Sequence, residues 1–81
     1  EQADICFSSI AQILAEAGAG IEHVLRFSAF VTRRQDMAEY MQVRDRWVAG
    51  LAVKPASTLM IVTGFTRPEF LVEVEALALA P

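Results

Sequence analysis

The stretch VLRFSAFVTRRQDMAEYMQVRDRWVAGLAVKPASTLMIVT, residues 24–63, decides the fold. In its first part, residues 24–32, successive side chains fall on two faces of different polarity, as they do in a strand. Its last part, residues 58–63, is strongly apolar and also has the pattern of a strand. The residues between them have the pattern of a helix that ends near Gly50. A strand, a helix and a second strand in this order predict a right-handed crossover that joins two parallel strands.

The sequence indicates where the helix inside this stretch begins. Asp36 stands where an N-cap is expected, and Glu39 follows three residues later, as in an aspartate version of the capping box. Arg44 interrupts the apolar stripe, and we expect its stem to lie along apolar surface while its charge reaches a polar edge. The predicted stripe consists of Met37, Tyr40, Met41, Trp47, Val48 and Leu51.

The first strand has one apolar and one mixed face. Period two places Leu25, Phe27, Ala29 and Val31 together, and Arg26, Ser28, Phe30 and Thr32 on the other side. Because the second face is mixed, we expect it to meet a partly polar surface.

Two further elements flank this unit. Before it, a helical stripe of Cys6, Ile10, Ile13, Leu14 and Ala17 ends at Gly18 and Gly20. After it, residues 64–69 form a connection of hairpin length, and residues 70–79 alternate as a third strand. The fold class is therefore α+β, a two-layer sandwich of a mixed sheet and two helices.

The bulk composition indicates that this sandwich is incomplete. Eighty-one residues suffice for a single domain, residues 1–81. Hydrophobic residues make up 54% of the chain without counting glycine, whereas an average domain reaches about 45–50% with glycine included. Three strands are also few for two helices. We therefore expect a partial domain whose N-terminal strands precede Glu1, and an apolar surplus that other subunits bury.

Charge and residue counts exclude several function classes. The net charge is −3, from seven Lys and Arg against ten Asp and Glu, and no basic stripe is present, which disfavours nucleic-acid binding. With one cysteine and one histidine, the chain lacks an internal disulfide and the ligands of a metal site. No apolar run approaches the ~20 residues of a membrane span. We expect a cytoplasmic protein that does not contact a membrane.

Paired carboxylates mark the last strand. In LVEVEAL, residues 71–77, period two puts Glu73 and Glu75 on one face among leucines. In a cleft, such a carboxylate acts as a general acid or base, or orients a water. The alternative is a solvated face, or ion pairs with Arg26, Arg44 or Arg67.

The run KPAST, residues 54–58, precedes the second strand. A loop stiffened by Pro55 can present backbone N–H groups and the hydroxyls of Ser57 and Thr58 to an anion. The alternative interpretation is an ordinary helix-to-strand loop with polar turn residues.

The order of these motifs resembles one family, the reactive-intermediate-deaminase (Rid, or YjgF) proteins, many of which carry the older label of L-PSP endoribonuclease. The resemblance rests on Gln2 at the start of the first helix, the strand that begins at His23, the helix start at Asp36, and the runs at residues 54–58 and 71–76. It covers the whole chain.

This resemblance implies a chorismate-mutase-like fold and a homotrimer whose three inter-subunit clefts bind small carboxylates. Active family members hydrolyse reactive enamines and imines with release of ammonia, and they need neither a metal nor an organic cofactor. An arginine in a Pro-Ala-Arg-Ser/Thr motif grips the substrate carboxylate, and a glutamate on the final strand positions water.

Carried over residue by residue, the resemblance makes Glu75 the water-positioning glutamate and Thr58 the hydroxyl residue of the loop motif. Ser57 stands in place of the arginine. Serine cannot supply the bidentate, charge-assisted grip that arginine gives a carboxylate. Arg26 or Arg44 would then have to hold the carboxylate from another direction.

Three functions follow as hypotheses. The first is an enamine or imine deaminase, a hydrolase that uses Glu75 to orient water. The second is a non-catalytic trimer that binds small metabolites, or a regulatory protein on the same scaffold. The third is an endoribonuclease, which the acidic balance and the missing basic patch disfavour.

Overall fold

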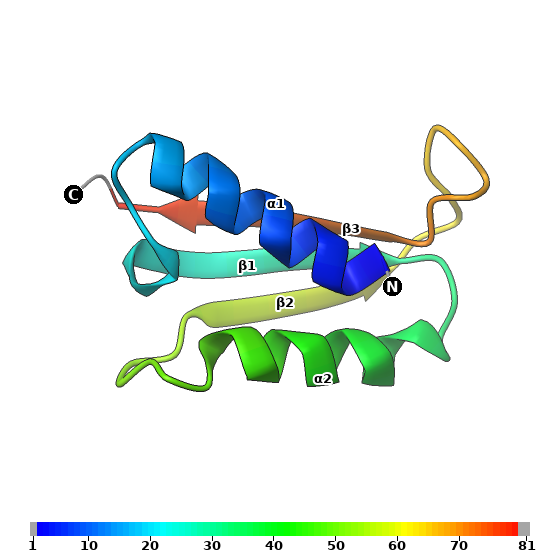
Figure 1. The fold of residues 1–81 in the computed structure, drawn as a ribbon. Helices are drawn as coiled ribbons and strands as arrows, with labels where there is room; N and C mark the ends of the chain where they lie inside the picture. Colours follow the sequence, from blue (N-terminus) through cyan, green and yellow to red (C-terminus); the bar gives the residue numbers. More distant parts are fainter. Residues whose placement is uncertain (1, 80–81) are drawn as a thin grey trace.

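The computed structural model describes residues 2–79 and confirms the α+β sandwich (Figure 1). Its elements in chain order are the helix α1 (Gln2–Glu16), the short 3-10 helix η1 (Ile21–His23), the strand β1 (Val24–Val31), the helix α2 (Asp36–Val48), and the strands β2 (Ala56–Ile61) and β3 (Val72–Ala78). The second strand begins and ends two residues before the predicted run, and the third is shorter than predicted at both ends.

The three strands form one mixed sheet in the order β2-β1-β3. β1 and β2 are parallel, as the crossover predicts, and the pairing of Ser28 with Thr58 fixes their register. β1 and β3 are antiparallel, with Ser28 opposite Glu75. The long central strand therefore carries both neighbours, and β2 and β3 form the two edges of the described sheet.

One prediction about β1 is wrong. Leu25 does not share the face of Phe27, because the register with β3 shifts between Val24 and Arg26. Such a bulge adds one residue to the strand and turns the side chains before it to the other face. Val24 is therefore buried in the core, while Leu25 remains exposed.

Aromatic side chains fill the space between the two helices and the sheet. Phe7 of α1 is fully buried and lies edge-on to Phe27 of β1, with ring centroids 5.1 Å apart. The same ring lies 5.8 Å from Tyr40 and 6.2 Å from Trp47, both on α2. Phe7 thus joins all three elements, and the open face of the sheet lies opposite this core.

The buried face of α1 differs from the predicted stripe. Ala3 and Phe7 lie in the core, and Ile10 and Leu14 pack against it. Ile13 of the predicted stripe is 65% exposed, and Cys6 is only half-buried. The predicted end of the helix is confirmed, because Gly18 has φ = 78°, a left-handed conformation that glycine adopts without strain.

The beginning of α2 also differs from the prediction. Asp36 is the first helical residue rather than the N-cap, and its buried carboxylate receives two hydrogen bonds of 2.8 Å from the Arg33 guanidinium. This bidentate pair satisfies a carboxylate that a capping box would have turned toward the backbone. Further along, Val43 occupies the core, and Met41 of the predicted stripe is exposed.

A side-chain clamp fixes where β3 begins. The Gln2 Oε1 accepts a hydrogen bond of 2.7 Å from the backbone N–H of Leu71, and its Nε2 donates one of 2.8 Å to the carbonyl of Glu69. The amide at the start of α1 thus pairs with the backbone as a neighbouring strand would. This contact ties residues 69–71 to the beginning of α1.

Candidate functional site

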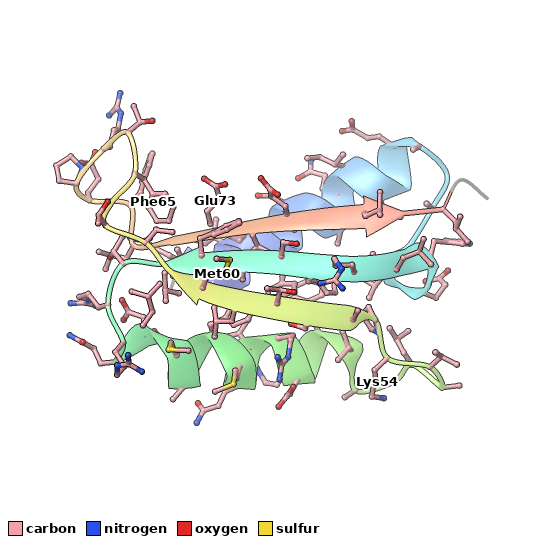
Figure 2. All side chains as sticks on the ribbon, turned by 180° about the vertical axis from the view of Figure 1, so that it is seen from behind. Lys54, Met60, Phe65 and Glu73 are labelled. Atoms are coloured by element: carbon pink, nitrogen blue, oxygen red, sulfur yellow. The ribbon has the colours of Figure 1, made fainter. Side chains whose placement is uncertain are left out.

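Three of the five predicted site residues lie on the open face of the sheet. The strand register places Thr58 of β2, Ser28 of β1 and Glu75 of β3 in one row across this face. The Arg26 guanidinium donates a hydrogen bond through Nη1 to Thr58 Oγ1. Hydroxyl, guanidinium and carboxylate groups therefore lie on one surface, and Glu75 is exposed there. Figure 2 shows this face, with Met60 and Glu73 in the next row.

The other two predicted residues lie on the opposite side of the sheet. Ser57 pairs with the core residue Phe27 and so points toward the helices, as its neighbour Thr58 points away. Arg44 reaches Ser57 from α2, with 3.3 Å between Nη1 and the Ser57 Oγ. Within one chain the structure thus brings Arg44 and Ser57 together, and it separates them from Glu75 by the thickness of the sheet.

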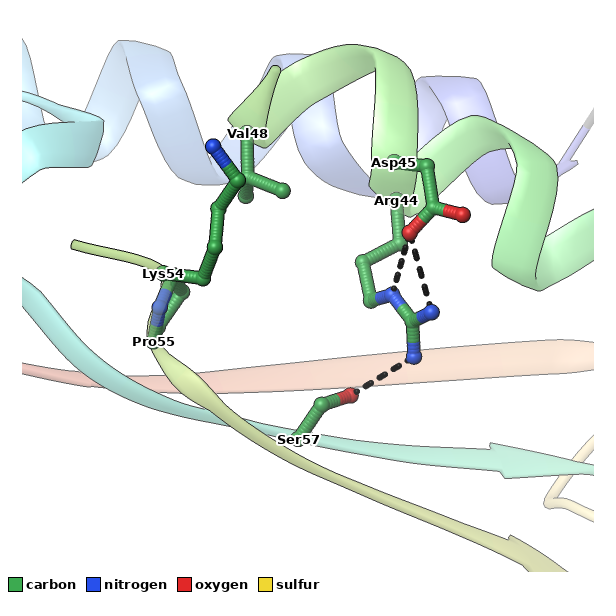
Figure 3. A pocket seen from close by; sticks show the side chains of 6 residues that line it. All are labelled: Arg44, Asp45, Val48, Lys54, Pro55 and Ser57. Carbon is green, nitrogen blue, oxygen red and sulfur yellow. Dashed lines mark hydrogen bonds and ion pairs between the residues drawn. The ribbon is translucent and has the colours of Figure 1, made fainter. Parts of the chain in front are cut away.

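Arg44 and Ser57 line a pocket of about 300 Å³ between α2 and the chain that leads into β2 (Figure 3). The six residues that line this edge pocket are Arg44, Asp45, Val48, Lys54, Pro55 and Ser57.

The Arg44 side chain is held in place inside the edge pocket. Its Nε and Nη2 donate hydrogen bonds of 3.1 and 2.9 Å to the Asp45 carboxylate. The Arg44 side chain is 24% exposed and that of Asp45 67%, so the guanidinium is partly screened from water while its acidic partner is not. Three of the five N–H donors of this guanidinium make hydrogen bonds to described residues, and two do not.

A buried hydroxyl lies beside this pocket. Burial raises the pKa of Tyr40, while the nearby Ser57 hydroxyl and Arg44 guanidinium act in the opposite direction. The Tyr40 hydroxyl is close enough to Ser57 for this effect, although no hydrogen bond of good geometry joins the two within residues 2–79.

The two glutamates of β3 take no part in the ion pairs of residues 2–79. Arg67 pairs with Glu69, with 3.5 Å between Nη1 and Oε2, and Arg44 pairs with Asp45. Glu73 and Glu75 are both exposed. Their carboxylates are therefore available to a ligand or to a neighbouring molecule.

A second, open groove runs between α1 and β3. Its volume is about 970 Å³, and its lining includes Ile5, Cys6, Phe70 and Glu73. Burial raises the pKa of the Cys6 thiol, and the nearby Glu73 carboxylate adds to this effect. The thiol donates a weak hydrogen bond to the Val72 carbonyl, at 3.9 Å.

We expect Cys6 to react slowly with iodoacetamide. A raised pKa leaves less thiolate at pH 7–8 than in a free cysteine, and the thiolate is the nucleophile. The same shift favours the folded state fully below the unfolded pKa of about 8.5, and this contribution is lost as the pH rises through the folded pKa. Alkylation rates in native buffer and in denaturant measure the difference. Equal observed alkylation rates at pH 7–8 and equal apparent pKa values of Cys6 in the two conditions would contradict this prediction.

Sequence reasoning missed Lys54 and Asp45 as parts of the edge pocket. Lys54 belongs to the run that already suggested anion binding, and its charge was the available signal. Asp45 follows Arg44 directly and gave no signal of its own.

Two searches of the described residues gave negative results. Among residues 2–79, no group of three or more His, Cys, Asp or Glu side chains could hold a metal ion. In the same part of the chain, every helix is too short or too polar to cross a membrane.

Comparison with known proteins places the chain in a family. The family model described as Endoribonuclease L-PSP matches residues 1–80. An uncharacterized protein of Streptomyces coelicolor is 31% identical over 75 residues, which are 93% of this chain and 54% of that protein.

Solved structures agree with this match. A YjgF family member from Neisseria meningitidis superimposes with a TM-score of 0.92 at 32% identity, over 100% of this chain and 66% of that one. A Pseudomonas aeruginosa protein of unknown function gives a TM-score of 0.91 at 32% identity, over 96% of this chain and 55% of that one. The chain therefore spans about half to two thirds of the length of these relatives. It belongs to the endoribonuclease L-PSP family, which is also known as the YjgF or Rid family.

Proposed function

We propose that the protein binds small carboxylates through Arg44 and Ser57 in a cleft between subunits, and hydrolyses enamines or imines there with a water oriented by Glu75. The observation that carries the proposal is the Arg44 guanidinium, which lies 3.3 Å from the Ser57 Oγ inside the edge pocket. Position 57 is where the family resemblance calls for an arginine. Arg44 supplies a guanidinium at that position from α2.

The Tyr40 ring supports the position of Arg44. The guanidinium carbon lies over this buried ring, 6.0 Å from its centroid, and the Tyr40 hydroxyl is close to Ser57. Tyr40 thereby packs against both groups of the clamp without lining the pocket itself.

The catalytic step needs a second subunit. Glu75 lies on the open face, and the edge pocket lies on the helix side. We propose a homotrimer in which the open face of one copy closes the edge pocket of the next. Exposed apolar side chains on that face, including Met60 and Leu77, support such an interface.

In this cleft the Glu75 carboxylate accepts a proton from a bound water. The water oxygen bonds to the imine carbon, and Glu75 passes the proton it took from the water to the imine nitrogen. The new hydroxyl then gives its proton to Glu75 and becomes the carbonyl as the carbon–nitrogen bond breaks, and this second proton leaves with the nitrogen as ammonia. The product is a keto acid. This is general-base catalysis with positioning by a charged clamp, and the chain's own groups supply both.

We further propose that the 81 residues are one part of a single domain of a cytoplasmic protein. The relatives are longer than this chain, and both β2 and β3 have a free edge in the described sheet. Additional strands at an edge would complete the layer that the two helices cover.

The alternative is a non-catalytic carboxylate binder, and one assay separates the two. Generate 2-aminoacrylate in situ and follow ammonia release with the full-length protein, with Glu75→Gln and with Glu73→Gln. We expect acceleration by the wild type and by Glu73→Gln, and its loss in Glu75→Gln. Loss in Glu73→Gln alone would move the catalytic role to the neighbouring carboxylate. If the wild type binds carboxylates without accelerating the reaction, the protein is a non-catalytic carboxylate-binding protein.

A further inference from the structure

Lys54 is the one cation of the edge pocket that the proposed function leaves unused. Its Nζ donates hydrogen bonds of 2.5 Å to the Leu51 carbonyl and 3.4 Å to the Ala49 carbonyl, just beyond α2. A lysine at this place complements the negative end of a helix. An ammonium has three donors, so one remains for another partner.

The edge pocket has a cation at each end. Arg44, Asp45 and Ser57 lie together at one end, and Lys54 lies at the other (Figure 3). Val48 and Pro55 add apolar side chains to the lining, on the side of Lys54 (Figure 3). The two cations therefore lie apart rather than being gathered around one anion.

The charges of the two ends differ. At the Arg44 end, the Asp45 carboxylate offsets part of the guanidinium charge. At the Lys54 end, the pocket lining contains no acid, and no ion pair of residues 2–79 includes Lys54. Its hydrogen bonds go to neutral carbonyls, so its positive charge is left for a ligand.

We infer that the ligand of the edge pocket is a dicarboxylate, with one carboxylate on Arg44 and Ser57 and the other on Lys54. Lys54 is then a specificity-determining residue that selects the second anionic group. The inference rests on the proposed function, because it assigns the first carboxylate to the same clamp. The apolar side chains of Val48 and Pro55 in the lining suit the methylene groups of such a ligand.

Titration calorimetry with butyrate, succinate, glutarate and adipate tests the inference on the full-length protein. We expect at least one dicarboxylate to bind about three- to tenfold more tightly than butyrate, the range that an exposed ion pair and partial desolvation give. Lys54→Met should weaken dicarboxylate binding by a larger factor than butyrate binding and thereby remove this preference. Lys54→Arg should retain it, and added salt should weaken it.

The matched control is Arg67→Met, which removes an exposed cation outside the edge pocket. It should leave the preference intact, which excludes a general effect of net charge. Equal binding of butyrate and all dicarboxylates by the wild type overturns the inference and leaves the proposed function standing. A preference that survives Lys54→Met overturns the role of Lys54. If neither class binds, the proposed function fails and the inference fails with it.

Discussion

Replacing Phe7 with alanine will lower the free energy of unfolding by about 3–5 kcal/mol. Phe7 is fully buried, and the substitution removes a whole ring from the junction of α1, α2 and the sheet. Small domains have a total stability of about 5–15 kcal/mol. The variant will therefore be partly unfolded at temperatures where the wild type is fully folded.

The size of this effect follows from the number of rings that Phe7 contacts. Its centroid lies 5.1 Å from that of Phe27, 5.8 Å from Tyr40 and 6.2 Å from Trp47. Each aromatic pair contributes about 0.5–1.5 kcal/mol beyond the burial of area. Since these partners come from two different elements, their rigid backbones limit how far the cavity can collapse, which keeps the cost at the upper part of the range.

Ile13→Ala is the matched control for Phe7→Ala. The apolar pattern of the sequence places Ile13 in the buried stripe, whereas the structure leaves it 65% exposed on the same helix. We expect a loss of about 1 kcal/mol or less. Urea unfolding followed by circular dichroism, at one fixed protein concentration, measures both variants. An equal loss for the two would show that the other face of α1 is buried in solution.

The order of elements was predictable from the sequence, but the face of α1 that is buried was not. A strand, a helix and a strand leave few topologies, and the parallel pairing of β1 with β2 follows. α1, in contrast, carries apolar residues on more than one face, with Ile5 and Ile13 exposed beside the buried Phe7. Periodicity alone cannot choose between such faces. The bulge at Leu25 depends on the partner strand β3, which local sequence does not encode.

The residues of the candidate site were partly predictable, but their division between two faces was not recognised. Ser57 and Thr58 are neighbours in a strand, so period two already requires them to point to opposite sides. Thr58 joins Arg26 and Glu75 on the open face, and Ser57 meets Arg44 on the helix side. This arrangement is the reason why a single chain offers two half-sites, and why a function that combines them requires assembly.

Replacing Arg44 with methionine will weaken carboxylate binding about ten- to hundredfold. Hydrogen bonds to a charged group contribute about 1.5–3 kcal/mol, and the loss is below that of a fully buried clamp because the Arg44 side chain is 24% exposed. Methionine keeps a long apolar stem against the Tyr40 ring, over which the guanidinium carbon lies 6.0 Å from the centroid. The change therefore removes the donors with little loss of packing. Calorimetry with butyrate measures it, and circular dichroism confirms folding.

Two further variants separate the clamp from a general electrostatic effect. Arg44→Lys keeps the charge but loses the planar fork, so it should recover only part of the affinity. Asp45→Asn should act in the opposite direction and strengthen binding about two- to fivefold, because it removes the negative charge that competes for Nε and Nη2 of Arg44. If the substitutions acted only by damaging the structure near the edge pocket, Arg44→Lys and Asp45→Asn would both weaken binding. If Arg44→Met binds butyrate as tightly as the wild type does, the carboxylate binds on the open face instead. Within residues 2–79, the hydrogen bond from Arg26 to Thr58 on that face is the only other one between a guanidinium and a hydroxyl.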